Sequence, residues 1–178
     1  MTDPVPLIMY DGLNSDAAAI KKRFPNAPVA YYVNGHYTWS SQEIQMFGRH
    51  IAISVEPHLP EAANGARCLD VERYDATPAD VKPFLVERAK YANNGTIYTS
   101  AANVRNVLDA AGNFDIPRWW IAWYWGRPGA PTAAQVQQAV RMNCGVSLPL
   151  SKIWACQYIS RAEWDESAVY GKKDFAHS

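Results

Sequence analysis

The sequence predicts an α/β fold, a small, trimmed β/α barrel of the TIM type with reduced helices near its C-terminal end. Apolar β-type runs alternate with amphipathic segments, as they do where helices join strands. Many of these runs are apolar on both faces, which is typical of a parallel sheet covered by helices. The chain has 178 residues, enough for a single domain over 1–178 but fewer than the roughly 250 of a full barrel. A doubly wound open sheet is the alternative.

The individual elements follow from local patterns. Strands are expected at 6–11, 27–34, 50–55, 66–72, 96–100, 118–125 and 152–159, and a short tail at 168–175 is expected to pair as one more. Helices are expected after Ser15, after Ser40 with its capping box, after Thr77, over 101–112 and from Thr132. The last two long strands share one helix and the tail has none, so the missing helices fall at the end of the chain.

Composition excludes several classes of function. Seventeen Lys and Arg residues balance 17 Asp and Glu residues, and this balance argues against nucleic acid or an anionic membrane as a partner. No apolar run is long enough to insert into a membrane. The N-terminus lacks a basic signal-peptide region. We therefore expect a protein made in the cytoplasm without a signal peptide, which needs another route if it acts outside.

Neither cysteine nor histidine spacing predicts a metal site. The three cysteines form no C-x-x-C motif, and the four histidines have no metal-ligand spacing. There is also no Gly-rich phosphate loop and no G-x-S-x-G elbow. The sequence therefore predicts no metal and no organic cofactor, and it predicts no oligomeric state.

The stretch CLDVERYDATP, residues 68–78, places two acids at the end of an expected strand. Residues i and i+2 of a strand point to the same side, so Asp70 and Glu72 are expected to share a face. Two neighbouring carboxyl groups do not ionise independently, so one stays protonated at a higher pH than usual. Such a pair suits acid/base hydrolysis of a glycosidic bond. The other interpretation is solvated charge where a strand ends.

Two further acids are expected at comparable places. Asp11 ends the first expected strand, and Asp165 follows the last long one. The first and last strands of a closed barrel are neighbours, so both acids are expected near Asp70 and Glu72. Asp11 is also a plausible cap for the turn that follows it, and Asp174 competes with Asp165 for the fourth position.

The motifs YDG (10–12), LDVE (69–72), IYTS (97–100), WWIAWYW (119–125), CQYIS (156–160) and WDESAVYG (164–171) occur in a characteristic order. This order resembles the family-25 glycoside hydrolases, the N-acetylmuramidase lysozymes, over about residues 7–171. The chain departs from the family at Cys156, where the family has an aromatic residue, and at D-E-S (165–167), where it has D-x-N.

The resemblance implies a β/α barrel that lacks helices near its end, and it implies roles for particular residues. Glu72 would be the general acid/base, and Asp70 would orient the acetamido group of the substrate in a retaining, substrate-assisted reaction. Asp11 and Asp165 would complete the acidic cluster. The residues that would line the sugar cleft are Tyr98, Trp120, Tyr124 and Gln157.

The expected function is hydrolysis of peptidoglycan at the β-1,4 bond between N-acetylmuramic acid and N-acetylglucosamine. The expected partner is the glycan strand of a bacterial cell wall, reached by a phage lysin after release from the cell or from a virion. One alternative is a catalytically inactive barrel that binds wall glycan or serves as a virion module. Another is a glycosidase that acts on a different polysaccharide.

Overall fold

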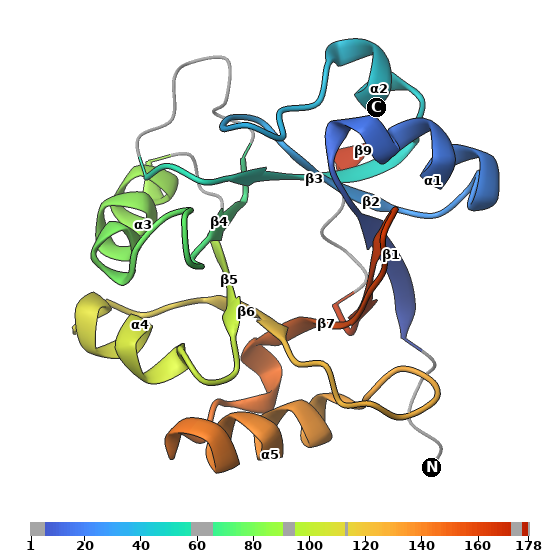
Figure 1. Ribbon diagram of the computed structural model, residues 1–178. Helices are drawn as coiled ribbons and strands as arrows, with labels where there is room; N and C mark the ends of the chain where they lie inside the picture. Colours follow the sequence, from blue (N-terminus) through green and yellow to red (C-terminus); the bar gives the residue numbers. More distant parts are fainter. Residues whose placement is uncertain (1–5, 58–65, 91–94, 113, 172–175, 178) are drawn as a thin grey trace.

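Strands close into a barrel and helices lie on its outside (Figure 1). The computed structural model describes residues 6–57, 66–90, 95–112, 114–171 and 176–177. The strands are β1 (Leu7–Asp11), β2 (Val29–Tyr32), β3 (Arg49–Ser54), β4 (Cys68–Asp70), β5 (Thr96–Ser100), β6 (Arg118–Ala122), β7 (Ile153–Ser160), β8 (Asp165–Val169) and β9 (Ala176–His177).

Strand pairing confirms the predicted barrel rather than the open sheet. Each of β1 to β6 pairs in parallel with the next strand, and β8 pairs with both β7 and β1 to close the ring. The short strand β9 pairs with the beginning of β3, whereas β4 pairs with its end. Closure leaves the carboxyl ends of β1 to β7 around one mouth of the barrel.

The last strand of the barrel differs from the expectation. The expected tail strand covered 168–175, with Asp165 in the loop before it, but β8 begins at Asp165. This strand is also antiparallel to both of its neighbours, because residues 161–164 provide only a short link from β7. Such a link joins antiparallel strands, while a parallel crossover needs a dozen residues or more. Residues 172–175, and Asp174 with them, lie outside the described part of the chain.

Five α-helices occur in the described residues: α1 (Ala17–Arg23), α2 (Ser41–Gln45), α3 (Val81–Ala89), α4 (Val104–Ala111) and α5 (Ala133–Cys144). Short 3₁₀ turns occupy Asn14–Asp16, Pro78–Asp80 and Leu150–Lys152. The capping boxes that open α2 and α5 form at Ser40 and Thr132. No helix joins β7 to β8, so the predicted reduction near the C-terminal end is confirmed. Among the described helices, none has the length and apolar character needed to cross a bilayer.

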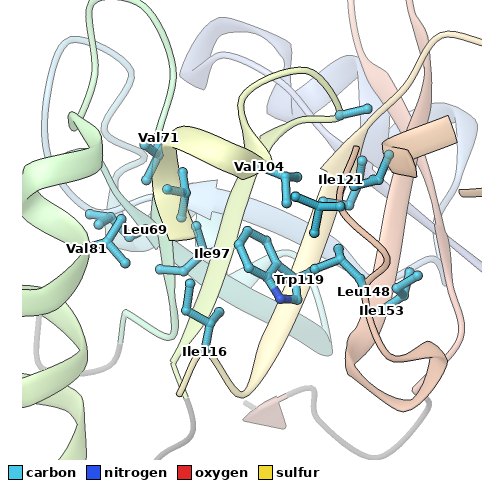
Figure 2. Close-up of a cluster of buried hydrophobic side chains, with 14 of the residues drawn as sticks. Leu69, Val71, Val81, Ile97, Val104, Ile116, Trp119, Ile121, Leu148 and Ile153 are labelled. Carbon is cyan, nitrogen blue, oxygen red and sulfur yellow. The ribbon is translucent and has the colours of Figure 1, made fainter. Parts of the chain in front are cut away.

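Two apolar layers hold the sheet between them. The outer layer packs the sheet against α3, α4 and α5, and Figure 2 shows Leu69, Ile97 and Trp119 pointing into it. The inner layer fills the barrel with side chains from every strand from β1 to β8, among them Met9 and Trp120. Because side chains alternate along a strand, one residue of each neighbouring pair enters each layer.

Candidate active site

Three of the four predicted acids stand on strands that end or begin at the same mouth of the barrel. Asp11 is the last residue of β1, and Asp70 is the last residue of β4. Since β8 runs in the opposite direction, its first residue, Asp165, lies at this same mouth. Asp11 and Asp165 are direct partners in the β1–β8 ladder. Two like charges directly opposite one another destabilise a sheet, so this pair has a structural cost.

Glu72 reaches the mouth by a different route from the one predicted. The strand that the sequence places over 66–72 ends at Asp70, so Glu72 lies in the turn that follows. Asp70 points into the barrel and is 2% exposed, whereas Glu72 is exposed to solvent. Strand alternation therefore does not align the two carboxyl groups. The turn brings them together instead, with one buried and one accessible.

Backbone hydrogen bonds hold this turn in place. The amide of Val71 donates to the carbonyl of Tyr98 at 2.9 Å and extends the β4–β5 ladder by one residue. The Val71 carbonyl accepts from Thr99 Oγ1 at 2.8 Å and from Asn103 Nδ2 at 3.4 Å. The amide of Ala76 then returns to the carbonyl of Asp70 at 3.1 Å. Glu72 thus projects from a loop whose two ends are tied to the barrel.

Burial and neighbouring carboxyl groups raise the pKa of both buried acids, Asp11 and Asp70. Burial raises the pKa of Asp11 well above its usual range, and Asp165, Asp70 and Glu72 raise it further. Burial likewise raises the pKa of Asp70, with further contributions from Glu72 and Asp75. One carboxylate oxygen of each has no hydrogen-bond partner among the described residues. Both observations favour the protonated forms of these acids.

Glu72 has a raised pKa even though it is accessible. Desolvation of its carboxyl group is the largest cause, followed by the charges of Asp75 and Asp165. Asp165 also has a raised pKa, because burial outweighs the hydrogen bonds that it receives. A carboxylic acid that retains its proton at a higher pH and faces solvent has the properties of a general acid.

Sequence reasoning missed two residues of the cluster. Asp75 lies three residues after Glu72, and its amide donates to the Glu72 carbonyl at 3.2 Å. Tyr32, the last residue of β2, donates its hydroxyl to Asp70 Oδ2 at 2.9 Å. Asp75 was visible in the same short stretch as the predicted pair. Nothing in the sequence links Tyr32 to Asp70, 38 positions away.

A chain of side-chain hydrogen bonds crosses the mouth beside the acids. Tyr98 donates its hydroxyl to Gln157 Oε1 at 2.6 Å, and Gln157 Nε2 donates to the Tyr124 hydroxyl at 3.0 Å. Tyr124 is 56% exposed. Desolvation, followed by the charges of Asp165, Glu72 and Asp11, raises its pKa to about 12. Tyr124 is therefore a solvent-facing ring beside the acidic cluster.

Trp120 and Tyr98 lie deeper than the resemblance implied. Trp120 is 0% exposed, packs edge to face against Tyr98 and Trp154, and donates Nε1–H to Ser167 Oγ at 3.0 Å. Tyr98 is 6% exposed. The expected place of Trp120 on a sugar-binding wall must be corrected, because alternation along β6 turns its ring into the barrel. The ring packs inside the barrel beneath the mouth and does not line the mouth itself.

Two cavities flank the acids. The larger, about 620 Å³, is lined by the loop that follows β4 (residues 71–78, which include Glu72 and Asp75) and by Ser100 and Asn103. The smaller, about 230 Å³, is lined by Gly12, Asp16 and residues 160–162, 164 and 165. In the closed strand order, the β4–β5 side is opposite the β8–β1 side. An elongated ligand that spans both cavities therefore crosses the acidic cluster.

No group of three or more His, Cys, Asp or Glu side chains in the described ranges is arranged to hold a metal ion. Each of the four carboxyl groups instead has a raised pKa, and burial is the largest cause in every case. The arrangement can donate a proton from Glu72 to a bound group, and the unpaired oxygen of Asp70 can accept a hydrogen bond from that group. These two capacities match hydrolysis of an acetal bond.

The buried acid Asp11 makes stability depend on pH. Its folded pKa is raised, so its contribution to stability is complete below the unfolded value of about 3.9 and is lost as pH rises through the folded pKa. We expect Asp11→Asn to raise the free energy of unfolding at neutral pH by roughly 1 kcal/mol, and to lower hydrolytic activity.

Thermal unfolding at several pH values measures this effect. The gain should shrink on acidification and vanish below about pH 3.9, where the wild-type carboxyl group is protonated in both states. Asp109→Asn, the same change at an exposed position on α4, is the control and should leave stability nearly unchanged. A gain that is constant with pH would show that ionisation of Asp11 is not its cause.

Comparisons with known proteins bear on the fold. Neither a scan against protein-family models nor a search of curated proteins finds a match. Among solved structures, a glycosyl hydrolase 25 of Streptococcus pneumoniae, described as a virulence factor participating in host cell invasion, is similar with a TM-score of 0.53 and 14% sequence identity. That alignment covers 94% of this chain and 88% of the other.

A multimodular pneumococcal cell wall endolysin from phage Cp-1, solved with choline, has a TM-score of 0.54 and 13% identity. The alignment covers 95% of this chain but 56% of the endolysin. At such low identity the similarity concerns the fold. The barrel and its shortage of helices near the C-terminal end thus agree with the fold that the order of the sequence motifs indicated, whereas the antiparallel strand β8 was not predicted.

Proposed function

We propose that this protein is a glycosidase that hydrolyses the glycan strand of bacterial peptidoglycan at the β-1,4 bond between N-acetylmuramic acid and N-acetylglucosamine, with retention of configuration. The observation that carries the proposal is the convergence of Asp11, Asp70, Glu72 and Asp165 at one mouth of the barrel, between two cavities. The similarity in fold to a glycosyl hydrolase and a cell wall endolysin supports it.

In the proposed reaction, Glu72 gives its proton to the glycosidic oxygen as the bond from that oxygen to the anomeric carbon breaks. The acetamido oxygen of the same sugar attacks the anomeric carbon and forms a cyclic intermediate. Asp70 accepts a hydrogen bond from the acetamido N–H through its unpaired oxygen and so holds the acetamido group in position for this attack. Glu72, now a carboxylate, takes a proton from the water that opens the intermediate. Two inversions give net retention.

The raised pKa of Glu72 suits the first step, and the environment of Asp70 suits the second. Glu72 keeps its proton to a higher pH than an ordinary glutamate because of desolvation and its acidic neighbours. Tyr32 holds the Asp70 carboxyl group by one oxygen at 2.9 Å, and the other oxygen has no partner among the described residues. A buried acceptor of this kind is available to a substrate N–H.

The test is incubation with purified peptidoglycan while new reducing ends are counted. Borohydride reduction followed by acid hydrolysis then identifies which sugar carries the new end. Reduced muramic acid is expected, and the first product detected by proton NMR should be the β anomer. Reduced glucosamine instead would refute the proposed bond, and an initial α anomer would refute retention. Chitin, which lacks muramic acid, and cellulose serve as parallel substrates.

The same test separates hydrolysis from the alternative of a non-enzymatic module. In this case the protein would bind wall glycan, as a virion part or a wall-binding domain, without releasing reducing ends. Co-sedimentation with insoluble peptidoglycan measures this directly. Binding without any release at any pH would favour the module.

The charge of Asp75 sets the pH range of the proposed reaction. Asp75 is the largest charged contributor to the raised pKa of Glu72, after desolvation. Asp75→Asn removes that charge and lowers the pKa of Glu72, so the acid form is lost at a lower pH. We expect the alkaline limb of the kcat/KM profile to move to lower pH. Asp109→Asn is the matched control, and an unchanged alkaline limb in Asp75→Asn would contradict this role.

A further inference from the structure

The loop that carries Glu72 also carries an aromatic side chain that the proposed mechanism does not use. Tyr74 lies two residues beyond Glu72 and is 88% exposed. Most other large hydrophobic side chains that face solvent in the described residues are exposed by half or less, and Tyr124 and Met142 reach 56% and 78%. A single exposed apolar residue is common on protein surfaces, so the exposure of Tyr74 gains meaning only from its backbone conformation and from the cavity beside it.

The backbone at Tyr74 adds a second observation. Its φ is 81°, and it is the one non-glycine residue with positive φ in the described chain. The left-handed region is unfavourable for a bulky side chain, and such strain persists only where surrounding structure imposes it. Here the hydrogen bonds from Asp75 to Glu72 and from Ala76 to Asp70 close the turn around Tyr74. The same turn that presents Glu72 therefore forces Tyr74 outward.

The ring of Tyr74 borders the larger cavity beside the acids. That cavity, about 620 Å³, runs from Glu72 past Tyr74 to Thr77, with Ser100 and Asn103 on its other side. The guanidinium of Arg73 lies 4.8 Å from the centre of the Tyr74 ring. It occupies one face of the ring, as in a cation–π contact. One aromatic face remains, beside hydroxyl and amide groups that can bond to a polar ligand.

We propose that Tyr74 is the platform of an outer saccharide subsite, in which its free ring face stacks on a sugar one or more units away from the bond that is cleaved. The inference rests on the proposed function, because the ligand class follows from a glycan that crosses the acidic cluster. The apolar C–H face of a sugar packs on an aromatic ring, while its hydroxyl and acetamido groups can form hydrogen bonds with Ser100 and Asn103. Tyr74 is thus a binding residue, and Glu72 performs the chemistry.

The experiment measures binding of soluble peptidoglycan glycan oligomers of two, four and six sugars by calorimetry. All proteins carry Glu72→Gln so that the ligand is not cleaved. Adding Tyr74→Ala is expected to weaken binding of the six-sugar oligomer by roughly threefold to tenfold, the range for one aromatic contact. Binding of the two-sugar oligomer should not change, because it does not reach an outer subsite.

Phe114→Ala is the matched control. Phe114 is also an exposed aromatic residue with a cation nearby, with Lys82 Nζ at 5.9 Å from its ring centre. It precedes β6, at the opposite end of the barrel from the acids. This variant should bind oligomers of every length as the parent does. Equal affinities for Tyr74→Ala and Phe114→Ala at all lengths would overturn the subsite.

A glycine variant separates binding from a structural role. Glycine adopts a φ of 81° without strain, so Tyr74→Gly is expected to raise Tm while it weakens binding of the six-sugar oligomer as Tyr74→Ala does. A lower Tm would show that the ring stabilises the loop, and would overturn the subsite. Equal weakening at two and six sugars would overturn its outer position.

These outcomes are distinct from failure of the proposed function. If the parent protein binds no glycan of any length and the wild-type protein releases no reducing ends, the proposed function fails. If the wild-type protein cleaves peptidoglycan and Tyr74→Ala behaves as Phe114→Ala does, the function stands and the subsite alone is refuted.

Discussion

Replacement of Glu72 by glutamine should lower the rate of peptidoglycan hydrolysis by at least about a hundredfold, the scale of a lost general acid. Glutamine keeps the size of the side chain and its hydrogen bonding, but it has no proton to give to the departing oxygen. The fold should remain intact, because Glu72 lies in an exposed turn and exposed isosteric changes seldom cost much stability. The measurement is the initial rate of reducing-end formation.

The control for this variant is Glu163→Gln, the same change at an exposed glutamate in the link between β7 and β8. Its rate should match that of the wild-type protein. Glycan binding by Glu72→Gln should also persist, because the bulk of the contact surface is unchanged. A Glu72→Gln protein that hydrolyses at the wild-type rate would remove Glu72 from the mechanism and leave the acids on β1 and β8 as the candidates.

Replacement of Trp120 by alanine should lower the free energy of unfolding by about 3–5 kcal/mol, the usual range for a buried aromatic residue. Trp120 is fully buried, contacts the rings of Tyr98 and Trp154, and bonds to Ser167. Its removal leaves a cavity inside the barrel and an orphaned hydroxyl on β8. Unfolding in urea, followed by circular dichroism, measures the loss.

Tyr124→Ala is the informative comparison, because Tyr124 was predicted for the same sugar-binding wall but lies at the surface. It should lower stability by less than about 1 kcal/mol and weaken glycan binding. Trp120→Phe should recover much of the stability lost in Trp120→Ala. If Trp120→Ala were as stable as the wild-type protein but bound glycan poorly, the tryptophan would have to contact the sugar directly.

Several local features of the fold could be predicted from the sequence. The strand expected at 96–100 is β5 with the same bounds, and the capping box at Ser40 forms as expected. Both signals are local, because alternation and capping depend on residues within a few positions of one another. The shortage of helices near the end followed from the chain length and the spacing of strands.

The sequence pointed to the acids of the candidate site, but not to Asp75 or Tyr32, and not to its geometry. Asp11, Asp70 and Glu72 lie at strand ends or just after them, where a barrel gathers chemistry, and their charges interact as expected. The sequence placed Glu72 inside a strand, because nothing local marks Asp70 as its last residue. The direction of β8 could not be predicted from nearby residues either, because it depends on how the strand pairs with both β7 and β1 when the barrel closes.

The sequence by itself determined the succession of strands and helices and the position of the acids near expected strand ends, because strand periodicity and acid positions are local features of the sequence. Only the tertiary structure decided which rings face inward and which reach solvent. Trp120 is buried and Tyr124 is exposed although four positions separate them, because β6 ends at Ala122 and the chain then leaves the sheet. Burial is a property of the closed barrel, and it sets both the raised pKa values and the surface that a glycan can reach.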